Sequence, residues 1–329
     1  MPTSKPQPKK APKMELKPPP EPVKPKVAFY TPVKNEAQHA QRWTTEGAKE
    51  ADYLFWLDTG STDDTPKHAE RAGITVVQAH FDPFRFDDAR NTALALLPDD
   101  VTHCLHVDAD EVVKPGWREE FEAHATHKRF RYALRNPAGE GWGQVIRANF
   151  HARHGYRWKG QVHEVVMGPE PTHMLETLVI EHHPNWEKPR SQYIDIMRRS
   201  VKEDTHDARM VFYLGRELWH KGEWEEARRV LMQYIGMPEA TWDVERQDAI
   251  RYIAKMDYHP ERWLLRAIAE APHRREPYVD LCRLYLAQQR MDEARGMYAA
   301  AERLTDETLY TTDPTAWGES FEALGKEVR

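Results

Sequence analysis

The chain has 329 residues, of which 40% are hydrophobic and 11 are Trp, so it is long enough for two domains with apolar cores. Its net charge of −6 argues against a broad nucleic-acid-binding surface. Its two cysteines, Cys104 and Cys282, cannot make a disulfide framework, which favours a cytoplasmic protein. No apolar run approaches the ~18 residues of a membrane span, so we expect no membrane partner.

The first 26 residues differ in composition from the rest of the chain. They hold nine of the 24 Pro and seven Lys against two Glu, so this segment carries a charge of +5 and the remainder −11. A Lys/Pro-rich segment with few large apolar groups cannot bury enough surface to offset its ordering entropy. We therefore expect residues 1–26 to be a disordered arm.

Strand-like and helix-like segments alternate from residue 27 onward. Runs of β-branched and aromatic residues predict strands, and the runs between them predict helices, one of which is capped by Ser61 or Thr62 and closed by Gly73. This alternation predicts a mostly parallel sheet with right-handed crossovers. The expected strands cover residues 27–33, 53–58, 74–78 and 102–107, and the other expected helices cover residues 35–49 and 87–97.

The sequence becomes less regular after Trp117. Residues 130–135, 144–151 and 178–181 are predicted to be antiparallel strands. No G-x-G-x-x-G motif follows the first strand, and no G-x-x-x-x-G-K-[ST] motif occurs anywhere. Dinucleotide-binding and P-loop interpretations therefore lose their main support.

The chain is predicted to be helical after about residue 186, and this region contains an internal repeat. One set of residues recurs with the same internal offsets 67 positions later, and an intervening unit fits between Pro238 and Pro272. The offsets resemble those of tetratricopeptide repeats, which are helix pairs that bury their faces by stacking. An ordinary helical bundle is the alternative. The first set is Leu214, Gly215, Leu218, Ala227, Leu231 and Tyr234, and the second is Leu281, Cys282, Tyr285, Ala294, Tyr298 and Ala301.

Two carboxylates spaced two apart, Asp108 and Asp110, follow the fourth predicted strand. In open α/β sheets, ligands bind at the carboxyl ends of the strands. Hard oxygen ligands at that edge suit Mg²⁺ or Mn²⁺ carrying a phosphorylated substrate. A solvated acidic turn is the alternative.

Five polar features occur in a characteristic order along the chain. They are Lys34-Asn35-Glu36, the stretch 58–65, Ala89-Arg90-Asn91, the stretch 108–111, and His163-Glu164 with His182-His183. Over about residues 27–240, this order closely resembles the family 2 glycosyltransferases with a GT-A fold. It is most similar to those that append a tetratricopeptide region, such as the peptide S-glycosyltransferases of glycosylated bacteriocins. The resemblance implies a Rossmann-like mixed α/β GT-A domain over residues 27–186 and a helical tetratricopeptide-like domain over 187–329.

The resemblance also implies a nucleotide site in the loops after the first two strands. Asp58 holds the family position that accepts a hydrogen bond from uracil N3–H, and a helix-entry turn is the alternative role. Asn35 and Glu36 lie in the loop that lines the nucleotide, near the ribose. For these two residues, a role at the start of a helix is the alternative.

Arg90 and the two aspartates are the next implied contacts. Arg90 suits a planar donor to uracil or a phosphate, whereas pairing with Asp87 or Asp88 is the structural alternative. In the family, the second aspartate of the D-x-D motif ligates the metal, which assigns Asp110 to Mn²⁺ or Mg²⁺. The first contacts ribose or a metal-bound water, which assigns Asp108.

A histidine after the last strands is a further metal ligand in many family members. His182 and His183 stand at that place, although the family usually has one His followed by an aromatic residue and Gly-Tyr. The His-His-Pro-Asn sequence does not decide between them, and we favour His182. A surface histidine pair is the alternative.

An inverting displacement requires a carboxylate that takes the proton of the acceptor. The Glu-Asp pair that often supplies it in this family is absent from the expected place. His163-Glu164 instead matches the repeat-bearing members, so Glu164 is the candidate base and His163 its orienting partner. A salt bridge of Glu164 with Arg157 or Lys159 is the alternative. Candidates for an apolar sugar platform are Trp142, Trp158 and Trp186, for which core packing is the alternative.

The implied activity is metal-dependent, inverting transfer of a hexose, with glucose expected, from a UDP-sugar to a macromolecular acceptor. A tetratricopeptide-like groove favours a peptide or protein acceptor, and the helical region would bind it or form a homodimer. One alternative is glucosylation of hydroxymethylated bases in DNA, with the basic arm holding phosphates. A non-catalytic repeat scaffold is the other alternative.

Overall fold

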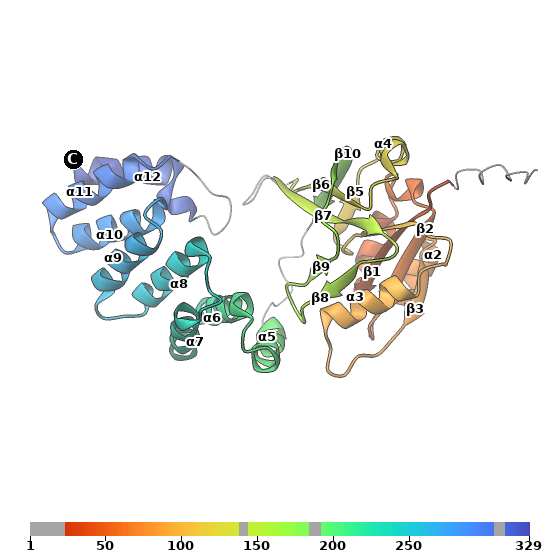
Figure 1. The fold of residues 1–329 in the computed structure, drawn as a ribbon, viewed down its shortest axis with the longest axis horizontal. Coiled ribbons are helices and arrows are strands. Elements are labelled where there is room, and N and C mark those ends of the chain that lie inside the picture. Colours follow the sequence, from red (N-terminus) through yellow and green to blue (C-terminus); the bar gives the residue numbers. More distant parts are fainter. Residues whose placement is uncertain (1–23, 138–143, 184–191, 306–312) are drawn as a thin grey trace, which may run out of the picture.

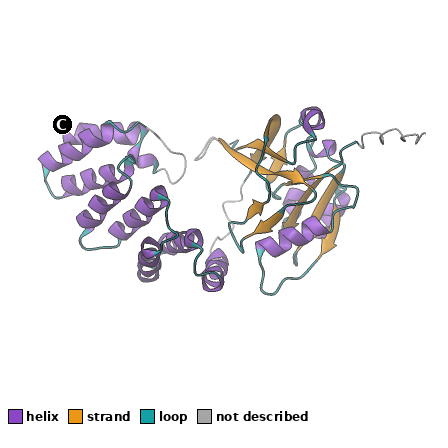
Figure 2. Ribbon diagram, viewed as in Figure 1, coloured by secondary structure: helices purple, strands orange, loops and turns teal. Residues whose placement is uncertain are grey.

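The computed structural model describes residues 24–137, 144–183, 192–305 and 313–329. A sheet domain occupies one end of the molecule and a helical domain the other (Figures 1 and 2). Most of the predicted arm, Trp142, Trp186 and the predicted domain boundary lie outside the described residues. Among the described residues, no helix combines the length and apolarity needed to cross a membrane.

The central sheet has eight strands in the order β3-β2-β1-β4-β7-β6-β10-β5. Strands β3, β2, β1 and β4 are mutually parallel, as predicted, and β7 runs antiparallel to both β4 and β6. Strand β1 is buried along almost its whole length, which suits a central parallel strand covered on both faces. The strands are Val27–Val33 (β1), Tyr53–Asp58 (β2), Thr75–Gln78 (β3), His103–His106 (β4), Glu111–Val113 (β5), Arg129–Arg135 (β6), Gln144–Ala152 (β7) and His173–His182 (β10).

The last long strand differs from the prediction in its direction. Strand β10 was expected to pair antiparallel, but it runs parallel to β6 and antiparallel only to β5. Between β7 and β10 the chain forms a separate two-stranded sheet, Arg157–Lys159 (β8) with Val165–Met167 (β9). The chain thereby crosses to the other side of β6 and enters β10 in the same direction as β6.

The long helix predicted over residues 35–49 is also wrong. This segment contains only short pieces, Ala37–His39 (η1), Ala40–Trp43 (α1) and Ala48–Glu50 (η2). Gly47 lies so close to the Val113 backbone that a side chain would not fit there. Packing of this loop against the edge of the sheet therefore replaces a continuous helix.

Three longer helices flank the sheet: Thr65–Arg71 (α2), Phe86–Ala95 (α3) and Arg118–His124 (α4). The predicted cap of α2 is wrong, because its N-cap residue is Asp64 and neither Ser61 nor Thr62 occupies that position. Gly73 follows α2 in the left-handed conformation, which glycine adopts without steric cost. The prediction that Gly73 ends this helix is therefore confirmed.

The helical domain is a row of antiparallel helix pairs (Figure 1). The second helices of the first and third pairs begin at Trp224 and Met291, which reproduces the 67-residue repeat. Ala227 and Ala294 are both fully buried at equivalent positions. The predicted architecture, a mixed α/β domain followed by a domain of repeated helix pairs, is confirmed. The helices are Gln192–Glu203 (α5), Ala208–Lys221 (α6), Trp224–Gly236 (α7), Asp243–Lys255 (α8), Pro260–Glu270 (α9), Glu276–Ala287 (α10), Met291–Glu302 (α11), Pro314–Ala316 (η3) and Gly318–Val328 (α12).

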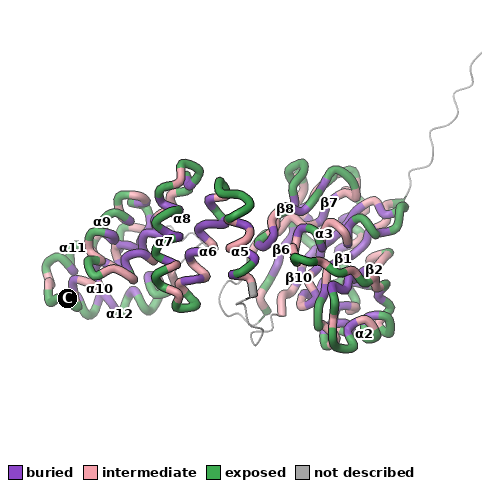
Figure 3. Tube along the Cα trace, turned by 90° about the horizontal axis from the view of Figure 1, so that it is seen from below, coloured by how far each residue is buried: buried purple, intermediate pink, exposed green. Residues whose placement is uncertain are grey.

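Buried residues occur throughout both domains (Figure 3). One face of the sheet packs Trp43, Trp56 and Trp117 into a single apolar cluster. Val162, from the loop between β8 and β9, belongs instead to the core of the helical domain, against which Phe84 and Phe86 also pack. The two domains therefore share apolar contacts.

Candidate functional site

The loops after β1 and β2 are bound to each other at the carboxyl edge of the sheet. Asp58 is the last residue of β2 and is fully buried. Its carboxylate accepts hydrogen bonds from the Ser61 backbone N–H at 3.1 Å, the Ser61 hydroxyl at 2.5 Å and Gln78 Nε2 at 3.2 Å. Ser61, a predicted helix cap, thus orders the turn after Asp58 instead.

The other predicted nucleotide contacts lie in the loop after β1. Asn35 is exposed and adopts a left-handed backbone with a φ of 56°, and its Oδ1 accepts the Thr62 N–H at 2.8 Å. The Glu36 N–H donates to Thr65 Oγ1 at 2.7 Å. Glu36 is the N-cap residue of the three-residue helix η1, without a side-chain cap hydrogen bond, so the alternative role at the start of a helix holds for it in this limited form. Both residues contribute to a defined loop beside Asp58.

Arg90 of α3 is the centre of a buried polar cluster, with only 11% of its side chain exposed. Its Nη1 donates to His106 Nδ1 at 2.9 Å, and its Nη2 lies 3.4 Å from Asp108 Oδ1 and 2.5 Å from Glu164 Oε1. Its guanidinium carbon lies 4.5 Å from the centre of the Trp158 ring. A planar, permanently charged group fits this set of partners.

The aspartates suggested as alternative partners of Arg90 contact a different arginine. Arg85 lies 3.0 Å from Asp87 and 3.4 Å from Asp88.

Burial, together with the charge of Arg90, holds the pKa of His106 well below its usual value. His106 is therefore neutral and can accept the hydrogen bond from Arg90.

Glu164 lies in the same cluster, with 8% of its side chain exposed. Burial raises the pKa of its carboxyl above the usual value, although Arg90 opposes the shift. Its ion pair is with Arg90 and not with the neighbouring cations of β8. His163 has a left-handed backbone with a φ of 52°, and its ring packs against Tyr213 of α6 with 4.3 Å between centroids. His163 therefore faces the helical domain.

The two aspartates of the D-x-D motif have separate partners. The Glu111 N–H donates to the Asp108 carbonyl at 2.9 Å, so the motif lies on a turn after β4 rather than within the strand. Asp110 Oδ2 lies 3.3 Å from His182 Nε2. His183 donates its backbone N–H to the Asp110 carbonyl at 2.8 Å, while its ring nitrogen lies 3.5 Å from Glu181 Oε2.

Asp110 and His182 fit an open site for a hard divalent ion and do not fit a closed structural metal site. Burial lowers the pKa of His182, but the hydrogen bond to Asp110 and its charge outweigh this and raise it overall. No group of three or more His, Cys, Asp or Glu within the described residues is arranged to hold a metal. Two protein donors do not make a closed structural site. They suit a hard divalent ion that completes its shell with waters and substrate phosphates.

Two further residues of the cluster, Arg147 and Glu111, were not among the predicted site residues, although Glu111 lies in the stretch 108–111. Arg147 of β7 lies 3.2 Å from Glu111 Oε1 and 3.8 Å from Asp108 Oδ2, and Glu111 also accepts the Asp108 N–H at 3.0 Å. Burial and the nearby Asp108 raise the pKa of Glu111 to about 7. Burial would raise the pKa of Asp108 too, but Arg90 and other cations lower it to about 2. Asp108 is therefore ionised at neutral pH.

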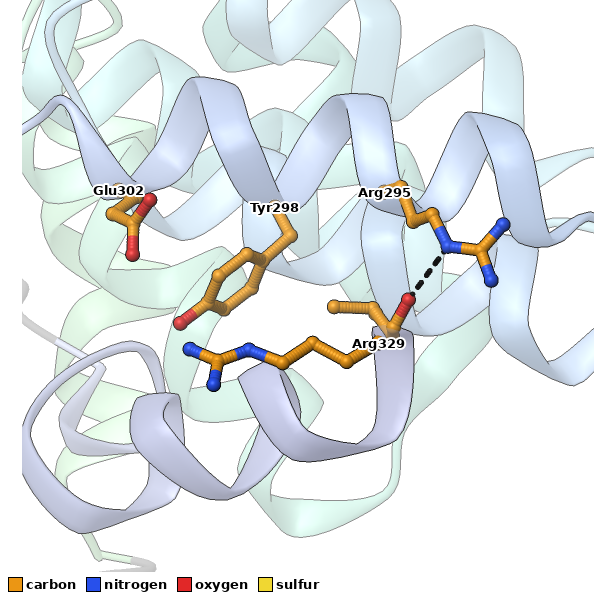
Figure 4. Close-up of a pocket in the computed structure, with 5 residues that line it drawn as sticks. Arg295, Tyr298, Glu302 and Arg329 are labelled. Atoms are coloured by element: carbon orange, nitrogen blue, oxygen red, sulfur yellow. Dashed lines mark hydrogen bonds between the residues drawn. The ribbon is translucent and has the colours of Figure 1, made fainter.

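A surface hollow in the described part of the helical domain lies apart from this cluster, between α11 and α12 (Figure 4). Arg295 Nε donates to the Val328 carbonyl at 2.9 Å, which ties the two helices together at one end of the hollow. The hollow contains none of the predicted site residues. Its lining residues are Arg295, Tyr298, Glu302, Val328 and Arg329.

No protein-family model matches the sequence, and no curated protein matches it. Among solved structures, the chain is similar to S. aureus TarS, with 12% identity and a TM-score of 0.38 over 75% of this chain and 53% of TarS. It is similar to glucosyl-3-phosphoglycerate synthase from Mycobacterium tuberculosis in complex with Mg²⁺ and UDP, with 14% identity and a TM-score of 0.37 over 54% of this chain and 77% of that one. For Pseudomonas aeruginosa PilF the identity is 13% and the TM-score 0.31, over 35% of this chain and 53% of PilF. The chain thus spans about half the length of TarS and of PilF, and similarities of this size carry no argument about function.

Proposed function

We propose that this protein is a divalent-metal-dependent glycosyltransferase that uses a UDP-sugar. The observation that carries the proposal is the convergence of side chains from four separate segments: α3, the turn after β4, the loop between β8 and β9, and β10. The Arg90 guanidinium contacts both Asp108 and Glu164. Asp110, two residues after Asp108 on the same turn, pairs with His182 of β10. Asp108 and Asp110 follow the carboxyl end of β4, which runs parallel to β1, and α/β sheets bind ligands at this edge.

The loops after β1 and β2 are the proposed nucleotide site. Asp58 would accept the N3–H of uracil, and Asn35 and Glu36 would line the ribose. Arg90 would contact the diphosphate or uracil, and Asp108 would reach ribose or a metal-bound water. The hydrogen bonds between the two loops support this assignment because they order both loops at the same edge of the sheet.

Asp110 and His182 are the proposed protein ligands of Mn²⁺ or Mg²⁺. His183 is the second candidate, although its ring lies beside Glu181. A bound ion would neutralise the negative charge that develops on the leaving diphosphate. Because the protein supplies two donors, we expect the ion to bind together with the nucleotide rather than alone.

Glu164 is the proposed base of an inverting transfer, with His163 beside it. A base whose pKa is raised towards neutrality is well matched to proton abstraction, and burial shifts Glu164 in that direction. We propose that the transferred sugar is a hexose such as glucose and that the acceptor is a peptide or protein. The helical domain would bind the acceptor or join two copies of the chain.

The first test measures UDP release from UDP-glucose, UDP-galactose and UDP-N-acetylglucosamine, with and without Mn²⁺. We expect metal-dependent release with at least one donor and a loss of at least ~100-fold in Asp110→Ala, because one metal ligand disappears. Asp99→Ala, which removes an exposed carboxylate from a loop, is the matched control and should leave the rate unchanged. Absence of UDP release together with no rise in melting temperature on adding UDP and Mn²⁺ would contradict the proposal.

The acceptor requires a separate comparison. The purified protein is incubated with the preferred donor and either a peptide pool rich in Cys and Ser or duplex DNA containing hydroxymethylcytosine. Sugar transfer to the peptide pool supports the proposed acceptor class. Transfer to the DNA alone would overturn that class while leaving the glycosyltransferase proposal intact.

A further inference from the structure

Glu164 ends the tight loop of residues 160–164, which joins β8 to β9. Gly160 has a φ of 116°, and a Cβ at this position would lie 3.2 Å from the Glu164 Cα. Two left-handed residues, Gly160 and His163, therefore occur within one five-residue loop. A loop of this shape is held by contacts from outside, and those contacts come from two different domains.

The first set of contacts comes from the start of α3. Asp87 is 7% exposed, and its Oδ2 accepts the Gly160 N–H at 3.1 Å. Arg85 donates to both oxygens of Asp87, at 3.1 and 3.0 Å. The Phe86 N–H donates to the Gln161 carbonyl at 3.0 Å. One turn further along α3, Arg90 contacts the Glu164 carboxylate, so the same helix binds both ends of the loop.

The second set of contacts comes from the helical domain. Glu203, the last residue of α5, accepts hydrogen bonds on one oxygen from Gln161 Nε2 and from Arg85 Nη1, both at 2.7 Å. Val162 is 5% exposed and packs in the helical core, and His163 packs against Tyr213. Three consecutive residues of the loop are therefore bound to α5 and α6.

We propose that Asp87 and Glu203, joined through Arg85, are positioning residues that place the Glu164 carboxylate, so that α5 and α6 are part of the catalytic scaffold. This inference rests on the proposed role of Glu164 as the base. A base must lie within hydrogen-bonding reach of the proton that it removes. A displacement of about 1 Å can lower a rate by about 100-fold. Asp87 is buried while the Glu203 side chain is 55% exposed, so Asp87 contributes more to the placement.

The test of Asp87 compares Asp87→Asn with Asp88→Asn. Asp88 is the matched control because it also contacts Arg85 but makes no bond to the loop. An asparagine at 87 keeps only one acceptor oxygen. Its amide N–H₂ must then face donors, either Arg85 Nε–H with the Asp88 N–H or Arg85 Nη2–H with the Gly160 N–H. We expect Asp87→Asn to lower kcat for UDP release from UDP-glucose by about 10- to 100-fold, with the Kd for UDP in Mn²⁺ changed less than twofold. Asp88→Asn should match the wild type in both measurements.

The contribution of the helical domain is tested at Glu203. Glu203→Ala should lower kcat several-fold without a change in KM for UDP-glucose. Glu203→Gln retains an acceptor oxygen for Gln161, so it should recover most of the rate. A loss of active protein alone would also lower the apparent kcat at unchanged KM, so the rate is divided by the fraction of protein that binds UDP in Mn²⁺. A kcat that returns to the wild-type value after this correction would show a purely structural role.

Amide hydrogen exchange of residues 158–166 provides a readout that does not depend on activity. The positioning contacts predict faster exchange in Asp87→Asn and Glu203→Ala, and unchanged exchange in Asp88→Asn. Wild-type exchange in both variants would overturn the positioning role even if the wild-type protein releases no UDP. An active wild type with unaltered kcat in Asp87→Asn would overturn it as well, whereas an inactive wild type with faster loop exchange would overturn only the proposed role of Glu164.

Discussion

At the scale of single residues, the arginine at position 90 contacts three polar side chains in the proposed site. Its guanidinium donates to His106, forms ion pairs with Asp108 and Glu164, and stacks on Trp158. A Lys ammonium at the same place is a compact point charge that cannot keep the planar, forked contacts. Arg90 is thus the residue at which a substitution that conserves charge should still impair function.

We predict that Arg90→Lys weakens UDP binding by about 10- to 100-fold, because one charge-assisted hydrogen bond contributes about 1.5–3 kcal/mol. Isothermal titration with UDP in the presence of Mn²⁺ measures this loss. Arg131→Lys on β6, an exposed position, serves as the control and should retain wild-type affinity. Wild-type affinity in Arg90→Lys would remove Arg90 from the nucleotide site.

A second residue-scale prediction concerns His151 of β7, which is fully buried. Its Nδ1–H donates to the Ala152 carbonyl at 2.9 Å, and burial lowers its pKa from 6.5 to about 4. Because the folded pKa lies below the unfolded one, the neutral ring stabilises the fold fully above pH 6.5. That stabilisation, of about 3 kcal/mol, is lost as the pH falls towards 4.

His151→Phe removes this titration and keeps an aromatic ring beside Tyr156. We expect the free energy of unfolding of this variant to fall by about 3 kcal/mol less than that of the wild type between pH 6.5 and pH 4. Urea unfolding at a series of pH values measures the difference. His154→Gln, an exposed substitution nearby, should retain the wild-type pH dependence, and a parallel curve for His151→Phe would show that His151 does not titrate in this range.

At the scale of elements, the helix pairs depend on small residues where two helices approach closely. A Cβ at Gly215 of α6 would lie 2.6 Å from Leu231 of α7, whereas a Cβ at Gly296 of α11 would meet nothing within 4 Å. Gly215→Ala should therefore destabilise the protein by about 1–3 kcal/mol through overpacking. Gly296→Ala should stabilise it by about 0.5–1 kcal/mol through helix propensity.

Thermal unfolding of these two glycine variants distinguishes packing from propensity. The expected melting temperatures lie on opposite sides of the wild-type value. If both variants raise the melting temperature, backbone propensity dominates at Gly215 and the close approach of α6 and α7 is not a packing constraint.

Element identity was largely predictable, because strand and helix periodicities are local properties of the sequence. The direction of β10 was not, since it depends on how the β8–β9 hairpin carries the chain across the sheet. The helix expected over residues 35–49 failed for a related reason, because contact with Val113, far along the chain, decides the conformation around Gly47. Tertiary packing overrode local preference in both places.

The candidate site shows the same division between local and long-range information. The D-x-D motif and the histidine pair are visible in the sequence, and the contact of Asp110 with His182 follows once β10 lies beside β5. Arg147 and Glu111 are 36 positions apart and meet only because β7 and the turn after β4 come together. No spacing rule in the sequence indicates that pair.

At the scale of the whole molecule, the sheet domain and the helical domain are joined by more than a linker. The loop of residues 160–164 belongs to the sheet domain by sequence but packs its Val162 into the helical core. Arg199 of α5 donates to the Phe84 carbonyl at 3.0 Å, which adds a polar contact across the same junction. The helical domain therefore makes both apolar and polar contacts with the sheet domain.

This junction has a consequence for how the architecture can be inherited. Exchange of the helical repeats between related proteins by recombination at residues 184–191 would separate Glu203 and Tyr213 from their partners at positions 85, 161 and 163. A viable chimera would need to carry the matching loop residues with the new helices. Lineages that share this arrangement should therefore diversify the helices of the later repeats, while α5, α6 and the loop are inherited as one block.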